Sequence, residues 1–251
     1  MQTPTPNVKI ERDGAVLCVT FDRPEKKNAL TGAMYRVATE ALRQADRDPA
    51  IGAVVFAGSG GMFTAGNDIA DFLDGGGGPG EFPAFTFIKT LALCETPLIA
   101  AIEGLAIGIG ATMTLHCDLV YAAPGTMFRL PFVDLGLVPE AASSLLLPRR
   151  IGKAKAAEFL LLGEAFGAEE ALRLGLANAI VPASELWGVA REKAGRLAAK
   201  PRGAIAATRR LMRGDGPEIQ ARIAEEARLF SIALQSDEAR AAFAAFLGKG
   251  R

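Results

Sequence analysis

Two glycine-containing turns, well separated along the chain, constrain its fold more than any other feature. The first is Phe63–Asp68, which reads Phe-Thr-Ala-Gly-Asn-Asp, and the second is Gly104–Gly110, which contains three glycines. Each turn follows an apolar, β-branched run and leads into a helical pattern, so both places are predicted to be strand–turn–helix units. Such turns leave backbone N–H groups free at a helix start, where the helix dipole also favours negative charge.

A candidate acid, Glu140, lies thirty residues beyond the second turn, directly after Pro139. If both turns direct N–H groups at one point they form an oxyanion hole, and an acid opposite completes a site for proton transfer. This is the working hypothesis. The alternatives are that the turns only allow tight packing between strand and helix, and that Glu140 is a solvated acid at a helix N-terminus.

Composition narrows the class of protein. The chain has 251 residues, half of them hydrophobic, which is enough for one large α/β domain or for a domain with a helical appendage. Basic and acidic residues both number 28, so the formal net charge is zero. Nucleic acid and anionic membranes select basic proteins, so neither is an expected partner. A neutral, apolar-rich chain instead suits an oligomer that buries surface.

No segment has the pattern of a secretion signal or a membrane span. The first seven residues are polar and proline-rich and lack an apolar h-region. The longest apolar run, Pro97–Cys117, is interrupted by Glu103 and three glycines. We therefore expect a cytoplasmic protein.

Cysteine and histidine usage points away from metal and triad chemistry. The three cysteines, Cys18, Cys94 and Cys117, have no metal-type spacing and lie in apolar contexts, which predicts reduced core residues. The single histidine, His116, excludes a histidine-based triad and a multi-histidine metal site. Its apolar neighbours favour a packed core residue over a catalytic base.

Hydrophobic periodicity predicts an α/β core followed by helices. Asp13-Gly14 punctuates an N-terminal hairpin, and Thr31 is a candidate N-cap for a helix to about Ala45. Strands are expected at Val8–Ile10, Ala15–Phe21, Ala53–Ala57, Pro97–Ile102, Leu119–Ala122, Met127–Leu130 and Asn178–Val181. Helices are expected up to Cys94, from near Gly108, and at Lys153–Leu162, Ala168–Leu174, Glu185–Ala199, Pro201–Leu211, Glu218–Ser231 and, capped by Ser236, Asp237–Leu247.

These elements divide the chain into an α/β core over residues 1–190 and a helical C-terminal region over residues 191–251. The helical region is expected to pack on the core or on a neighbouring subunit. The loop Gly75–Gly80 is not followed by Gly-Lys-Ser/Thr, so it is interpreted as a lid or linker and not as a phosphate loop. The second turn lacks the acid about twenty residues on that a ribose would need, which disfavours a dinucleotide-binding oxidoreductase.

Further motifs surround the two turns and reach almost to the C-terminus. They are Arg23-Pro24, Asn28-Ala29-Leu30, Cys117–Ala122, Leu135-Gly136 with Pro139, Ala171–Gly175, and Phe246 with Lys249. In this order and spacing, together with both turns, they resemble the crotonase superfamily (enoyl-CoA hydratase/isomerase) over nearly the whole chain. The resemblance implies a crotonase-like spiral of ββα repeats with a helical C-terminal region, assembled as a homotrimer or a dimer of trimers.

The resemblance also implies an acyl-CoA thioester as substrate, its carbonyl held between the backbone N–H groups of Ala65 and Ile109. Ile109 replaces a usual glycine, so the second donor survives provided that Ile109 needs no positive φ. Coenzyme A is part of the substrate, and no separate cofactor or metal is expected. Further substrate-binding or CoA-binding positions carried over from the family are Lys26, Lys27, Ala29, Gly66, Asn67, Asp68, Ile69, Gly108, Phe132, Phe246 and Lys249. Ordinary surface charge is the alternative for the lysines.

The acids decide which reaction is expected. A hydratase resembling this chain would have glutamates at the positions of Thr112 and Phe132, one to activate water and one to deliver a proton. Both are missing here, so Glu140 remains as the catalytic candidate. The run around it, like Ser236-Asp237-Glu238, resembles the peroxisomal-type enoyl-CoA delta isomerases, in which this acid is the single base.

The expected reaction is therefore the shift of a 3-enoyl-CoA double bond into conjugation with the thioester. Apolar neighbours of Glu140 (Phe132, Leu135 and Val138) are expected to raise its pKa by desolvation. The alternatives are another crotonase reaction, such as hydration or thioester hydrolysis, and a catalytically inactive acyl-CoA-binding member.

Overall fold

Two sheets form the frame of the molecule. The computed structural model describes residues 7–70, 82–214 and 216–248. In the larger sheet, β1 and β2 pair in an antiparallel hairpin and the other neighbours are parallel. Its order is β1 (Val8–Asp13), β2 (Val16–Phe21), β3 (Ala53–Gly58), β4 (Leu98–Ile102), β6 (Leu119–Ala122) and β9 (Ala179–Ile180). The smaller sheet has the order β5 (Leu105–Ile107), β7 (Met127–Arg129) and β8 (Phe166–Gly167).

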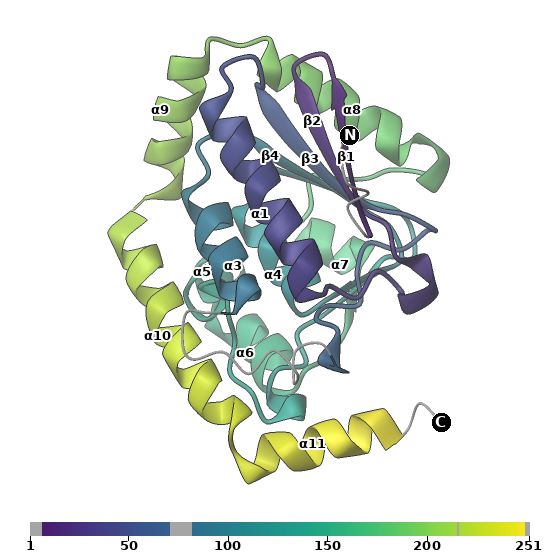
Figure 1. Ribbon diagram of the computed structural model, residues 1–251, viewed down its shortest axis with the longest axis vertical. Helices are drawn as coiled ribbons and strands as arrows, with labels where there is room; N and C mark the ends of the chain where they lie inside the picture. The colour runs from purple at the N-terminus through teal and green to yellow at the C-terminus, as the bar shows by residue number, and fades with distance from the viewer. Residues whose placement is uncertain (1–6, 71–81, 215, 249–251) are drawn as a thin grey trace.

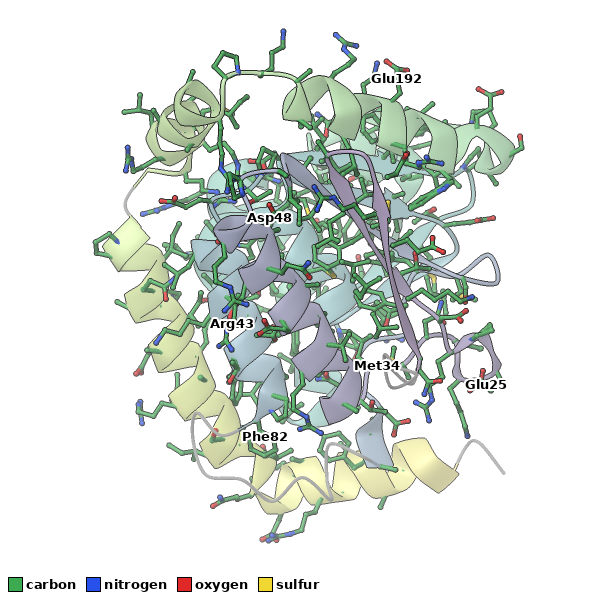
Figure 2. All side chains as sticks on the ribbon, turned by 45° about the horizontal axis from the view of Figure 1, so that its top comes forward. Glu25, Met34, Arg43, Asp48, Phe82 and Glu192 are labelled. Atoms are coloured by element: carbon green, nitrogen blue, oxygen red, sulfur yellow. The ribbon has the colours of Figure 1, made fainter. Side chains whose placement is uncertain are left out.

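Helices cover both faces of the larger sheet, which is why its inner strands are apolar without interruption. Alternate residues, such as Val54 and Phe56 of β3, face the core shared with α1 (Gly32–Arg47) and α3 (Pro83–Leu93). The intervening Val55 lies in a second cluster, which α8 (Ala183–Ala198) closes from the other side. Figure 2 shows α1 between the labelled Met34 and Arg43, and α8 marked by Glu192.

The C-terminal helices wrap around this core. In Figure 1, α10 (Gly216–Leu234) runs along one side of the molecule and α11 (Asp237–Gly248) crosses its lower end. The buried residues Ile219, Ile223, Glu226 and Phe230 recur at helical spacing on α10, so one stripe of this helix faces the core. The other α-helices of the described residues are α4 (Ile109–Thr112), α5 (Ser143–Ile151), α6 (Lys153–Leu161), α7 (Ala168–Arg173) and α9 (Arg202–Arg213).

Most of the expected elements are confirmed within a few residues. Thr31 caps α1 by accepting a hydrogen bond from the Met34 N–H, and Ser236 caps α11 by accepting one from the Ala239 N–H at 3.1 Å. Among the α-helices and β-strands of the described residues, three were not anticipated: α5, the two-residue β8, and β5, which lies inside the second glycine turn. The loop Gly75–Gly80 lies outside the described residues.

The expected boundary between core and helical region, at residue 190, falls inside α8. Because α8 contributes Leu186, Ala190 and Ala194 to one cluster with the sheet, both halves of the helix pack on the core. Within the described ranges, every helix is too short or too polar to span a bilayer.

The cysteines and the histidine are core residues, as expected. All three thiols are free and buried, and burial raises their pKa values, to about 11 for Cys18. Burial likewise lowers the pKa of His116 to about 4, so its ring is neutral at pH 7. Its Nε2 lies 2.8 Å from the carbonyl oxygen of Ala141.

Candidate active site

An isolated β-bridge brings the two glycine turns together. Thr64 pairs with Ala106, and its N–H donates to the Leu105 carbonyl at 2.8 Å while its own carbonyl accepts from the Ile107 N–H at 3.1 Å. The close approach requires glycine. A Cβ on Gly66 would lie 2.9 Å from the Ile107 oxygen, and one on Gly110 would lie 2.6 Å from Cγ2 of Thr64. The two turns therefore lie side by side, as the working hypothesis requires.

The prediction that Ala65 supplies the first N–H donor is wrong. Its N–H donates to the Lys27 carbonyl at 2.9 Å and is therefore occupied. A bridge between Leu30 and Asn67 explains which N–H of the first turn is free. Leu30 accepts a hydrogen bond from the Asp68 N–H and donates one to the Gly66 carbonyl, so the N–H of Asn67, between them, points away from Leu30. Among the described residues, the N–H of Asn67 has no acceptor, so Asn67 takes the place expected for Ala65.

Ile109 is placed as expected. It is the first residue of α4, and Gly108 before it has φ 56° and ψ −119°, a conformation suited to glycine. Ile109 itself has no positive φ, so the missing glycine does not distort the turn. Its N–H is one of the unpaired donors at a helix start and has no acceptor in the described part of the chain.

Both turns line a cavity of about 380 Å³. Its wall is completed by Phe132 and its neighbours, by Phe230 of α10 and by Phe243 of α11, so most of the lining is apolar. The candidate positions that line it are Lys26, Ala29, Ala65, Gly66, Asn67, Asp68, Ile69, Gly108, Ile109 and Phe132. Helices α10 and α11 of the C-terminal region therefore complete the wall of a cavity that the two glycine turns also line.

Of the other three candidate CoA-binding positions, the side chain of Lys27 alone is within the described part of the structure, and it does not line the wall. Lys27 is exposed, and it contributes its carbonyl to the turn instead of a side chain to the cavity. Phe246 belongs to α11, but its side chain is outside the described part of the structure. Lys249 lies outside the described residues.

Asp68 is held by an ion pair. Arg23 Nη1 lies 2.6 Å from Asp68 Oδ2 and also donates to the Ala29 carbonyl at 3.1 Å. The buried Asn28 accepts from the Arg23 N–H at 2.7 Å and donates to the Met62 carbonyl at 2.6 Å. This network ties the chain before α1 to the first turn, and it pairs the carboxylate of Asp68 with a guanidinium.

Glu140 is deeply buried, with 4% of its surface exposed. The alternative of a solvated acid at a helix start is therefore wrong. The Thr112 hydroxyl donates to its Oε1, whereas its Oε2 is buried with no partner among the described residues. Burial raises the pKa of Glu140 to about 8, assisted by the nearby charge of Glu226 and opposed by the hydrogen bond from Thr112.

Glu140 does not itself line the cavity, but Ile109 at the start of α4 and Leu137, just before Glu140 in the chain, both line it. Ile109 begins the short helix α4, which ends at Thr112, the partner of Glu140. Leu137, three residues before Glu140, lines the cavity with Ile109. A neutral acid with one unpartnered oxygen thus lies one helical turn behind a free N–H donor. Such a site can accept and return one proton beside a stabilised oxyanion.

Comparison with known proteins identifies the family of this chain. The family model described as enoyl-CoA hydratase/isomerase matches residues 11–251. Enoyl-CoA delta isomerase 2 of Rattus norvegicus is 37% identical over 72% of this chain, which spans about half (48%) of the rat protein. A probable enoyl-CoA hydratase, echA8, of Mycobacterium bovis is 35% identical over 96% of this chain and 95% of its own length.

A solved structure shares the whole architecture. The enoyl-CoA hydratase/isomerase from Pseudoalteromonas atlantica T6c has a TM-score of 0.92 and 39% identity, and the alignment covers 97% of each chain. It confirms the expected fold class, a crotonase-like α/β spiral with a helical C-terminal region. By sequence and by structure, this chain belongs to the enoyl-CoA hydratase/isomerase family.

Proposed function

We propose that this enzyme shifts the double bond of a 3-enoyl-CoA to give the conjugated 2-enoyl-CoA. The observation that carries the proposal is the buried carboxyl group of Glu140, which has a raised pKa, an Oε2 without a partner among the described residues, and a place behind the N–H donor of Ile109. The positions where a hydratase of this type needs glutamates hold Thr112 and Phe132. Thr112 supports Glu140, and Phe132 makes that part of the wall apolar.

In the proposed mechanism, the thioester oxygen accepts hydrogen bonds from the N–H groups of Asn67 and Ile109. Oε2 of Glu140, as a carboxylate, removes a proton from C2, and the electrons of that C–H bond form a dienolate that extends over the C3–C4 double bond. The protonated Glu140 then delivers the same proton to C4, and the double bond forms between C2 and C3. Each donor contributes on the order of 3 kcal/mol to the transition state.

The cavity also suggests how the rest of the substrate lies. The acyl chain would occupy the apolar part formed by Phe132, Phe230 and Phe243. Lys26 lines the same cavity and offers a positive charge for the CoA phosphates. The resemblance implies a trimer, and Leu211 and Met212 of α9, exposed by 84% and 79%, are side chains that a subunit contact would cover.

Hydration of a 2-enoyl-CoA is the second candidate, because full-length relatives such as the Mycobacterium bovis protein are named probable enoyl-CoA hydratases. The test is conversion of a 3-enoyl-CoA and, separately, a 2-enoyl-CoA by the wild type and by Glu140→Ala. Formation of the conjugated product by the wild type alone supports the isomerase. Hydration that survives the substitution would refute the role given to Glu140.

A further inference from the structure

The backbone that follows Glu140 has an unusual conformation. Ala141 and Ala142 have φ values of 58° and 55°, in the left-handed region that residues with a Cβ rarely adopt. Both are buried, so water cannot satisfy their backbone groups. The Ser143 N–H donates back to the Glu140 carbonyl at 3.0 Å, which closes a tight turn. A conformation of this kind persists only where neighbouring groups hold it.

Glu226 of α10 holds this turn from outside. Its Oε2 accepts from the Ala142 N–H at 2.6 Å, and its Oε1 accepts from both the N–H and the hydroxyl of Ser144, at 3.0 and 2.6 Å. Ala142 precedes α5 and Ser144 is its second residue, so the carboxylate satisfies donors that a helix start leaves unpaired. Glu226 is 4% exposed, and it lies one helical turn before Phe230 of the cavity wall.

We propose that Glu226 is a positioning residue, which fixes the backbone of residues 140–144 and thereby directs the carboxyl group of Glu140 toward the substrate. The inference rests on the proposed function, because it assigns Glu226 a part in the same reaction. Among the described residues, the hydrogen bonds of Glu226 come from the backbone of Ala142 and from the backbone and hydroxyl of Ser144, so its proposed action is through Glu140 and not on the substrate.

The charges around the turn predict that a positioning role of Glu226 also changes the pKa of Glu140. Glu226 is the charged group that raises the pKa of Glu140 from α10. His116 contacts the Ala141 carbonyl as a neutral ring. Burial raises the pKa of Glu226, and its hydrogen bonds from Ser144 and Ala142 and the charge of Arg222 oppose this shift. Arg222, also on α10, donates to the Ser144 hydroxyl at 3.1 Å. Removing the charge of Glu226 therefore lowers the pKa of Glu140, which the loss of a helix cap alone would not do.

The test compares Glu226→Gln with Glu225→Gln, an adjacent and exposed glutamate paired with Arg228. Glutamine keeps the volume but has one acceptor oxygen, so at least one of the two anchoring N–H groups loses its partner. We expect kcat for a 3-enoyl-CoA to fall about 10- to 100-fold in Glu226→Gln with KM within about twofold, and both constants to stay near wild type in Glu225→Gln. Ser144→Ala, which removes a single one of the three hydrogen bonds, should give a smaller loss of kcat and serves if Glu226→Gln does not fold.

A second measurement does not depend on turnover. The carboxyl carbon of Glu140 is followed by NMR in protein labelled with ¹³C-glutamate and assigned by its loss in Glu140→Gln. We expect a titration midpoint near 8 in the wild type and a lower one in Glu226→Gln, with no change in Glu225→Gln. An unmoved midpoint, or an unchanged kcat with only a lower melting temperature, would reduce Glu226 to a helix cap. A wild type without isomerase activity would refute the proposed reaction, whereas the titration still decides whether Glu226 controls Glu140.

Discussion

Replacing Glu140 by glutamine should make the protein more stable at alkaline pH while removing its proposed activity. Burial raises the pKa of this carboxyl from 4.5 to about 8 in the folded protein. Below pH 4.5 the group is neutral in both states and costs nothing. Between pH 4.5 and 8 the unfolded chain loses the proton while the folded protein retains it, so stability falls as pH rises. At about 1.4 kcal/mol for each pH unit of this interval, the full cost is about 5 kcal/mol above pH 8.

Glutamine cannot ionise, so Glu140→Gln avoids this cost. We expect urea denaturation to show little difference from wild type at pH 4.5, and a gain in unfolding free energy that grows to about 5 kcal/mol at pH 8.5. The melting temperature should rise by about 10–20 °C at the higher pH. The exposed Glu225→Gln serves as the control and should show no such growth with pH. A difference between Glu140→Gln and wild type that stays constant from pH 5 to 8.5 would refute the reasoning, because it would mean that Glu140 ionises without a penalty.

Three further outcomes test the site and its frame. The kcat/KM of the wild type should rise with pH toward about 8, where Glu140 becomes a carboxylate. Thr112→Val should move this rise to higher pH, because the hydrogen bond from Thr112 lowers the pKa of Glu140. Both effects are measured from the absorbance of the conjugated product at a series of pH values. Ile109→Pro, at the first position of α4 where proline fits, should lower kcat about 100- to 1,000-fold by removing the N–H donor, whereas Ile109→Ala keeps the donor and should stay far more active in the same assay. Arg209→Met should lower the unfolding free energy by about 3–5 kcal/mol, measured in urea, because it leaves Asp118 without the guanidinium that contacts both its oxygens at 2.8 Å; an effect below 1 kcal/mol would mean that water replaces this ion pair.

The sequence predicted those parts of the fold that depend on local patterns. The N-terminal hairpin follows from alternation around Asp13-Gly14, and α1 from its cap Thr31 and its apolar stripe. β5 was missed because its three residues lie between glycines and are recognisable as a strand only through pairing with β7. α5 was missed because its start depends on Glu226, which is distant in the sequence.

The candidate site could be predicted from the sequence only where it depends on short motifs and residue types. The prediction of Ile109 was carried over from the family resemblance by its position in the second glycine turn, and Glu140 was predicted as the acid left where hydratase glutamates are absent. The choice of Ala65 over Asn67 failed because a bridge to Leu30 decides which N–H is free, and nothing in the glycine pattern specifies that bridge. The burial of Glu140 behind the cavity wall likewise depends on how α4 and α10 pack around it.

The pairing of Thr64 with Ala106 has a consequence for how a scaffold of this kind changes during evolution. Both free N–H groups belong to the main chain, and their spacing is set by backbone hydrogen bonds between the two turns. Ordinary side-chain substitutions, including isoleucine at position 109, leave the proposed oxyanion hole intact. Acids at positions such as 112, 132 and 140 can then be gained or lost one at a time. A lineage can exchange one enolate reaction for another by drift at a few side chains, without ever losing the ability to stabilise the intermediate.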